Sequence, residues 1–374
     1  MNMIDTVILN IPQTNVRVVA DGNARPWDLH SKSGIFAKYT KNPPRGLKDG
    51  IYRPRLTGMV RSVGRGQKIS FLKIEFSAPK LIYNNNLDEL VESDFGRVIE
   101  TLYKRLTEVG VVINKVDLRQ ATVAAFHPSK NIVLVDGYTA SFVAHEISKI
   151  NLNLKFGLQK TSFRNGGQSL QGYTQAHAIV LYDKIADLAQ PKKRAIDKDQ
   201  TPIQLSIFEH LREIQPSLEV LRLEIRLTQK QKINGLFRKL DLPIDPTFEQ
   251  VFRKNVCQKV VRFYWDTMVE GENLFLFGIE CSAQNLLKRL LRDKALRPKE
   301  AVYLIGLNEL CKDEGGIRTF RTVIEKRLSR RGWYRFAIGI KQINGVRKSA
   351  PMHGWVLQVR SALKRFEAYR VRSP

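Results

Sequence analysis

The sequence predicts an α+β protein in which the strands of a mainly antiparallel sheet come first and helices follow. Two observations support this class. Short apolar or alternating segments, which are typical of strands, are spread through the first 240 residues. Beyond Gly235 the apolar spacing becomes helical and stays so. We therefore expect an α+β first domain over residues 1–240 and a mostly helical second domain over residues 241–374.

Each element follows from its apolar spacing and its stop signals. Strands are expected at residues 6–11, 69–76, 111–118, 121–126, 178–182 and 219–227. Helices are expected at residues 87–109, 137–150, 247–268, 283–292, 298–311, 320–328 and 333–343. Pro12 ends the first strand and Gly110 ends the first helix. Residues 24–65 are expected to form loops with short strands, and residues 191–202 a polar loop.

The charge indicates a polyanionic partner. The 374 residues carry a formal net charge of +26, which opposes folding unless a polyanion such as nucleic acid neutralises it. Residues 287–374 hold 22 Lys and Arg against 7 Asp and Glu, a net of +15, so the C-terminal part is the expected binding segment. The alternatives are an anionic membrane surface and a solvated basic face without specificity.

Several function classes are excluded by what the sequence lacks. The three cysteines are far apart and form no CxxC pair, so neither a zinc site nor a disulfide framework is suggested, and a reducing cytoplasm fits. No run of 18 apolar residues and no signal peptide occurs, which weakens the membrane alternative. The absence of a GxxxxGK[ST] loop argues against an ATPase and against a nucleotide cofactor.

Charged side chains alternate with leucine and isoleucine along residues 219–227. On a strand, Arg222, Glu224 and Arg226 share one face, and the apolar residues share the other. As a functional hypothesis, Glu224 binds a divalent cation and an arginine holds a phosphate. As a structural alternative, the strand is exposed and its charges form cross-strand ion pairs.

Tyr182 is a candidate nucleophile at the end of the next strand upstream. On a strand it points the same way as Lys184, and a lysine or a metal ion favours the phenolate form. Asp187 is a possible metal ligand or base. The structural alternative is that Tyr182 packs like any other strand aromatic.

Three more side chains are candidate ligands at strand ends. Asp117 closes the expected strand at 111–118 and is either a turn residue or an oxygen ligand for Mg²⁺ or Mn²⁺. His127 and His177 lie at the ends of two other strands, and each is either a ligand or a surface or core histidine.

Several of these stretches resemble, in order, motifs of the filamentous-phage gene II replication initiation proteins. They are Ile4–Leu9 with Pro12, Ser77–Leu81 with Asn86, Asn114–Asp117, Leu181–Lys184 with Asp187, Leu221–Arg226, and the later segment Leu328–Phe336. Similar Tyr-Asp-Lys and Arg-x-Glu pairs occur in plasmid rolling-circle initiators. The sequence lacks the His-x-His pair of the better-known His-hydrophobic-His (HUH) endonucleases, and it has Asp187 where the motif has Glu.

The resemblance implies a Rep-like nicking domain that cuts one strand of a replication origin in a bacterial host cytoplasm. Tyr182 would attack the scissile phosphate and keep the 5′ end, leaving a 3′-OH for the host replication machinery. Asp117 and Glu224 would bind Mg²⁺ or Mn²⁺, with His127 as a further candidate ligand and with Lys184 and Asp187 in support. The expected contacts to single- and double-stranded DNA are Arg222, Arg226, Arg330, Arg331 and Arg335.

Two alternatives to the nicking enzyme stay open on the sequence. A non-catalytic DNA-binding regulator would account for the charge alone, with steep salt dependence and no cleavage. An RNA-binding or structural nucleoprotein would bind unrelated RNA with similar affinity.

Overall fold

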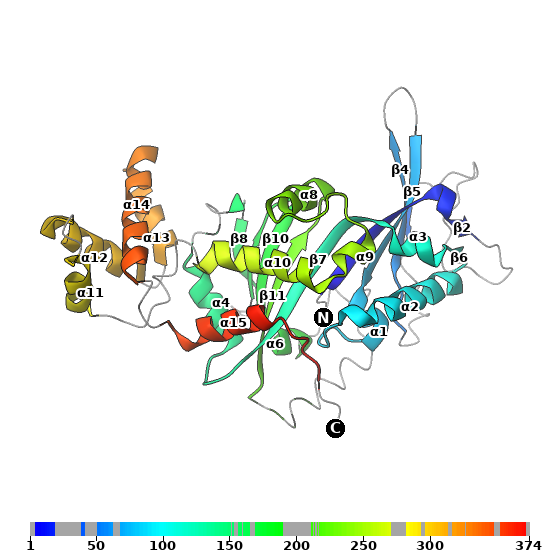
Figure 1. Ribbon diagram of the computed structural model, residues 1–374, viewed down its shortest axis with the longest axis horizontal. Coiled ribbons are helices and arrows are strands. Elements are labelled where there is room, and N and C mark those ends of the chain that lie inside the picture. Colours follow the sequence, from blue (N-terminus) through cyan, green and yellow to red (C-terminus); the bar gives the residue numbers. More distant parts are fainter. Residues whose placement is uncertain are drawn as a thin grey trace.

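The computed structural model confirms an α+β fold built on one antiparallel sheet (Figure 1). It describes residues 4–18, 39–41, 51–62, 68–150, 152, 156–158, 160–164, 169–189, 211, 213, 215, 217–270, 282–292, 296–312, 316–325, 327–347 and 352–371. The expected loop at 191–202 lies outside these residues. None of the described helices has both the length and the apolar run that crossing a bilayer requires.

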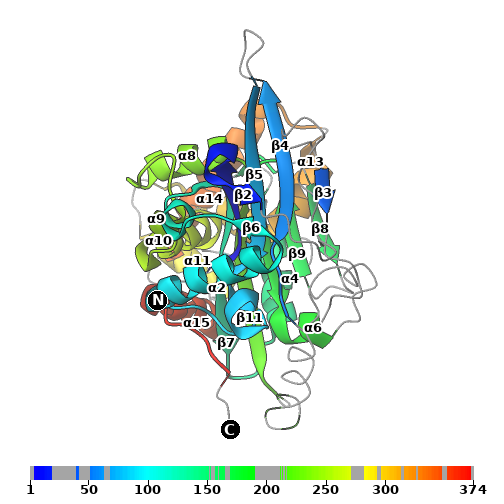
Figure 2. The ribbon, with the colours of Figure 1, turned by 90° about the vertical axis from the view of Figure 1, so that its right-hand side faces the viewer.

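Nine strands form the sheet in the order β3-β4-β5-β1-β7-β11-β10-β9-β8, and every neighbouring pair is antiparallel. Their bounds are β1 Ile4–Pro12, β3 Tyr39–Lys41, β4 Arg55–Ser62, β5 Lys68–Ser77, β7 Thr122–Leu134, β8 Lys160–Arg164, β9 Ser169–Tyr173, β10 His177–Asp183 and β11 Glu219–Leu227. A separate pair joins β2 (Arg17–Val18) and β6 (Val111–Val112). The β4–β5 hairpin projects from the body of the sheet (Figure 2).

The helices before residue 240 are α1 Ala78–Tyr83, α2 Phe95–Glu108, α3 Lys115–Arg119, α4 Ala140–Ser148, α6 Lys184–Ala189 and α8 Lys230–Lys239. Those after it are α9 Phe248–Val251, α10 Lys254–Trp265, α11 Ala283–Leu290, α12 Pro298–Lys312, α13 Gly316–Glu325, α14 Arg330–Arg347 and α15 Gly354–Arg365. Short helical turns lie at η1 Gln13–Asn15, η3 Glu92–Asp94 and η4 Asp266–Glu270. Thr139, Thr247 and Ser282 begin α4, α9 and α11 by accepting a backbone N–H with their hydroxyls.

The two faces of the central strands differ in chemistry, as the alternation in residues 219–227 predicts. On β11 the odd-numbered residues from Leu221 to Leu227 are apolar and buried, on the face where Phe126 packs edge-to-face on Phe237 of α8. Helices α8, α9, α10 and α15 contact β7, and α8 and α10 also contact β11. The opposite face, which we call the polar face, carries Arg222 and Glu224. Because both faces are covered, β11 is buried almost throughout rather than exposed on one side.

The expected boundary near residue 240 does not coincide with a break in packing. Helices α9, α10 and α15 come after it in the sequence, yet they pack on β7 and share its apolar core. Their amphipathic faces are buried there because the apolar face of the sheet needs a cover. Helices α11 to α14 pack against one another at the end of the molecule beyond β8 (Figure 1).

Two element predictions are wrong, and each has a local cause. The strand expected at 111–118 ends at Val112, and the chain turns at Asn114 into α3. The helix expected at 87–109 begins only at Phe95, because the Asn85 side chain accepts the backbone N–H groups of Leu87 and Asp88 and holds a turn instead. Several elements were not foreseen, among them β8, β9, α1, α3, α6, α8 and α15.

Candidate active site

Tyr182 and Glu224, two of the predicted site residues, lie together on the polar face. Tyr182 of β10 is paired with Arg222 of β11, two residue pairs from Glu224. The Tyr182 hydroxyl donates a hydrogen bond to Glu224 Oε2 across 3.3 Å. Arg226 donates from Nε to Glu224 Oε1 at 2.7 Å. Alternation along two adjacent antiparallel strands is the cause of this arrangement, because it places all of these side chains on one side of the sheet.

Glu224 is a buried carboxylate that stays ionised. Its side chain is only 2% exposed. Burial opposes its charge, but the guanidinium groups of Arg226 and Arg222 outweigh burial and hold the pKa of Glu224 well below its usual range. The site therefore contains a fixed negative charge whose two oxygens are already held by donors.

Tyr182 is a neutral phenol in this arrangement. Burial raises its pKa well above the ordinary value, although the nearby Arg222 charge acts in the opposite direction. The Lys184 ammonium lies 5.6 Å from the centre of the Tyr182 ring. Lys184 belongs to α6 rather than to β10 and is fully buried, bonded to Asn86 Oδ1 at 2.8 Å. Asp187 lies one turn further on and contacts Lys184 at 3.7 Å.

Arg222 holds the architecture of the site and does not face a ligand. It is 1% exposed, so the expectation that it contacts DNA is wrong. Its guanidinium donates to the Asn86 carbonyl at 2.7 Å and to Ser129 Oγ at 2.9 Å. It also lies 3.4 Å from Asp5 Oδ1. Arg222 thereby joins β1, β7 and the loop after α1 on the polar face.

Asp117 is not part of this cluster, which corrects the expected ligand pair. It lies on α3, where Asn15 donates to its Oδ1 at 2.9 Å. β7 starts five residues later at Thr122, and Ser129, the neighbour of Glu224, is seven residues along that strand. At about 3.3 Å per residue the two carboxylates are separated by roughly 20 Å. A shared metal ion is therefore excluded for this pair.

A polar cavity opens beside Glu224 on the polar face. Its volume is about 270 Å³, and Glu224, His127 and Arg226 are among the residues that line it. The lining also includes acidic and basic groups from β1, β4, β5, α1 and the loop before β4, namely Asp5, Glu75, Arg53, Arg55 and Lys80. The cavity is thus flanked by cations that suit a phosphate and by carboxylates that suit proton transfer or a cation.

His127 is a neutral imidazole at the edge of the cavity. Its Nδ1 lies 3.7 Å from Glu224 Oε1. Burial lowers the pKa of His127 below the ordinary 6.5, and the attraction of Glu224 compensates only in part. His127 therefore carries no charge at neutral pH.

His177 lies on the opposite face of the sheet from Tyr182. It begins β10, its ring centre is 6.0 Å from that of Tyr264 of α10, and Thr174 Oγ1 lies 3.1 Å from its Nδ1. Within the described part of the chain its Nε2 has no partner. Burial lowers the pKa of His177 to about 4. It is therefore a core histidine and not a member of the site.

Replacing His177 with glutamine is expected to flatten the acid side of the stability curve. The pKa of His177 is lower in the folded than in the unfolded chain. As pH falls from about 6.5 to 4, the unfolded chain therefore binds a proton that the native chain does not bind, and the native state loses stability. Between pH 7.5 and 5 this linkage amounts to about 2 kcal/mol. Urea unfolding at both pH values measures it, with His145→Gln on the exposed side of α4 as the control. If the His177 variant lost as much stability as the parent between pH 7.5 and pH 5, the pH dependence would belong to other groups.

Several residues of the site were missed because their sequence signals are weak. Asp5 and Ser77 were noted only within motifs, and their carboxylate and hydroxyl lie 3.2 Å apart. Glu89 is 3% exposed, bonds Lys130 at 2.8 Å and accepts the Tyr369 backbone N–H at 2.7 Å. The C-terminal segment is thereby tied to the loop that carries Asn86. Spacing along the sequence holds no signal for such distant contacts.

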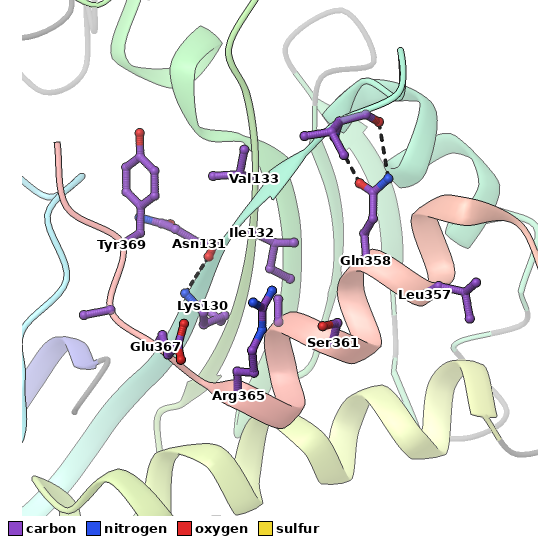
Figure 3. A pocket seen from close by; sticks show the side chains of 13 residues that line it. Lys130, Asn131, Ile132, Val133, Leu357, Gln358, Ser361, Arg365, Glu367 and Tyr369 are labelled. Carbon is purple, nitrogen blue, oxygen red and sulfur yellow. Dashed lines mark hydrogen bonds between the residues drawn. The ribbon is translucent and has the colours of Figure 1, made fainter. Parts of the chain in front are cut away.

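A larger cavity of about 590 Å³ lies away from this chemistry, between β7 and α15 (Figure 3). Gln358 of α15 bonds the backbone of Val135 there, with Oε1 accepting its N–H at 3.0 Å. The lining is largely apolar, apart from groups such as Arg365 and Glu367. None of the predicted site residues borders it.

The remaining predicted DNA contacts lie on α14, at the far end of the molecule (Figure 1). Arg330 begins this helix, and the side chains of Arg331 and Arg335 are exposed. Arg226 is the one predicted arginine that both borders the polar cavity and remains partly exposed, at 37% of its side chain. The expected contacts therefore divide between two separate surfaces.

The described residues do not form a ready metal site. No three His, Cys, Asp or Glu side chains among them converge closely enough to hold an ion. Glu224 is the best candidate metal ligand, but its two oxygens already accept hydrogen bonds from Arg226 and Tyr182. The dependence on Mg²⁺ or Mn²⁺ stays a prediction.

No protein family model, characterised protein or solved structure matches the chain.

Proposed function

We propose that this protein cuts and rejoins one strand of DNA at a replication origin, with Tyr182 as the nucleophile. The observation that carries the proposal is the contact between the Tyr182 hydroxyl and Glu224, beside a cavity flanked by arginines. The net charge of +26 supports a polyanionic substrate. The activity is that of a rolling-circle initiator, which acts in the host cytoplasm and delivers a 3′ end to the host replication machinery.

The proposed step balances without a nucleotide cofactor. The Tyr182 oxygen attacks the scissile phosphorus, and the bond from phosphorus to the 3′ oxygen breaks. The phenolic proton is released as the new bond forms, while Glu224 remains ionised beside Arg226. The departing 3′ oxygen takes up one proton and becomes a 3′-OH. The phosphotyrosine conserves the energy of the phosphodiester, so the reverse attack by a 3′-OH closes the strand.

The cations at the cavity supply the electrostatic part of this reaction. A phosphate in the cavity would lie among Arg53, Arg55, Lys80 and Arg226. Guanidinium groups match the geometry of phosphate oxygens and stabilise the charge that develops during transfer. Tyr182 is neutral and shielded while Glu224 holds it, so we propose that substrate binding turns its hydroxyl from Glu224 toward the phosphate.

The experiment that tests this function identifies the atom that carries the DNA. The protein is incubated with a 5′-labelled single strand that contains the replicon's origin, with Mg²⁺, with Mn²⁺ and with EDTA. Digestion and mass spectrometry then locate the nucleotide on a peptide. A phosphotyrosine at Tyr182 is the expected result, and dependence on the cation tests the metal prediction. Binding without an adduct under every condition would favour the non-catalytic DNA-binding regulator.

A further inference from the structure

The outward side of α14 presents an aromatic ring between two cations. Tyr334 is 68% exposed, and Arg331 and Arg335 are exposed beside it. Ile338 follows one turn later and is 44% exposed. Residues three or four apart share one side of a helix, so these four side chains form a continuous strip, which we call the α14 ridge.

The core of the helical part is complete without Tyr334. On the inner side of α14, Phe336 lies 5.5 Å from Phe320 and 5.9 Å from Tyr303, measured between ring centres. Trp333 joins this group, with Arg321 stacked on its ring at 5.1 Å. Packing therefore explains the presence of Trp333 and Phe336 on α14, but it does not explain the exposed Tyr334.

The surroundings of the ridge are strongly basic. The 18 residues of α14 include five Lys and Arg and no Asp or Glu. Residues 282–347 hold 16 basic against 6 acidic residues. Among the side chains that the structure describes, neither Arg331 nor Arg335 has a carboxylate partner. Both guanidinium groups are therefore available to an external anion.

We propose that the α14 ridge binds single-stranded DNA, with Tyr334 stacked on an unpaired base and Arg331 and Arg335 on the flanking phosphates. Base stacking on an exposed ring needs no particular sequence, but it needs a base face that is not already stacked in a duplex. The proposal rests on the proposed function, because nicking followed by displacement is what supplies a single strand. The site of chemistry lies on the polar face of the sheet, so the two surfaces are separable by mutation.

The test measures binding without cleavage, using the full-length Tyr182→Phe protein as the background. Fluorescence anisotropy compares a labelled 20-nucleotide oligo-dT strand with a 20-base-pair duplex. Tyr334→Ala is expected to weaken binding to the single strand by about 5- to 100-fold. Tyr334→Phe keeps the ring and should remain within about twofold of the parent. Val323→Ala, at a residue that is 71% exposed on α13, is the matched control.

Two further readouts separate stacking from charge. Tyr334→Trp should show fluorescence quenching by oligo-dT beyond that of the parent. Replacing Arg331 and Arg335 together with glutamine should reduce the salt slope for single-strand binding by about 1.4, which is about 0.7 for each phosphate that the protein no longer neutralises.

Three outcomes would overturn the inference. Equal weakening for duplex and single strand would mean that the ridge does not select unpaired bases. Unchanged binding in Tyr334→Ala would remove the ring from the contact. An effect of Tyr334→Ala on vesicles of anionic lipid but none on DNA would assign the ridge to a membrane surface. None of these results depends on whether Tyr182 forms an adduct.

Discussion

Replacing Tyr182 with phenylalanine is expected to abolish the covalent protein–DNA adduct. The change removes only the hydroxyl that donates to Glu224 at 3.3 Å. The aromatic ring is retained and should keep its contact with Lys184. Loss of that hydrogen bond is expected to lower the free energy of unfolding by about 1 kcal/mol, which leaves the protein folded. Gel shift after denaturation measures the adduct, and circular dichroism with urea unfolding checks the fold.

Two tyrosines provide controls for this variant. Tyr264→Phe changes another buried tyrosine, on α10, and should leave the adduct intact. Tyr52 is the tyrosine that lines the polar cavity, and its hydroxyl accepts the Ser77 backbone N–H at 2.7 Å. An adduct that survives in Tyr182→Phe but disappears in Tyr52→Phe would transfer the nucleophilic role to Tyr52.

Replacing Glu224 with glutamine is expected to damage both stability and activity. The carboxylate offsets the charges of Arg222 and Arg226, and its removal leaves buried Arg222 with less compensation. Breaking a buried ion pair from one side typically lowers the free energy of unfolding by about 3–5 kcal/mol. Because Glu224 also positions the Tyr182 hydroxyl, the rate of adduct formation should fall by about 10²-fold. Urea unfolding and the rate of adduct formation measure the two effects.

The effect of the Glu224 variant should depend on pH in a defined direction. The folded-state pKa of Glu224 is depressed, so its contribution to stability is fully present above the unfolded value of about 4.3 and is lost as pH falls below it. The stability gap between parent and variant should therefore be constant from pH 8 to 5 and shrink at lower pH. Glu219→Gln, on the same strand but on the other face, should show no comparable gap. A gap that stays constant down to pH 2.5 would show that the Glu224 charge is not what stabilises the strand.

Local patterns were enough to predict most of the elements. The strand at 219–227 was predicted to the residue, and those at β1, β5 and β10 to within about two residues, because each combines alternation with clear stop signals. The helices α11, α12 and α14 were likewise expected from their apolar spacing. The error at 87–94 arose because the Asn85 side chain holds a turn there. The error at 111–118 arose because the strand pairs only with the two-residue strand β2.

The candidate site was likewise predicted in part and missed in part. Alternation was sufficient to place Arg222, Glu224 and Arg226 on one face of their strand. The position of Tyr182 on a neighbouring strand was sufficient to predict it as a residue of the same site. The separation of Asp117 from Glu224 was invisible in the sequence, because it depends on which strands are neighbours and on how far each runs.

The sequence alone determined the α+β class, the excess of positive charge and the side of each strand on which a residue lies. These properties follow from periods of two and of 3.6 residues and from composition, all of which act within a few residues. Only the tertiary structure decided that Glu224 is buried among arginines, that Glu89 ties the C-terminal segment to the site, and that Tyr334 faces outward. These features depend on contacts between residues far apart in the chain, for which local spacing has no signal.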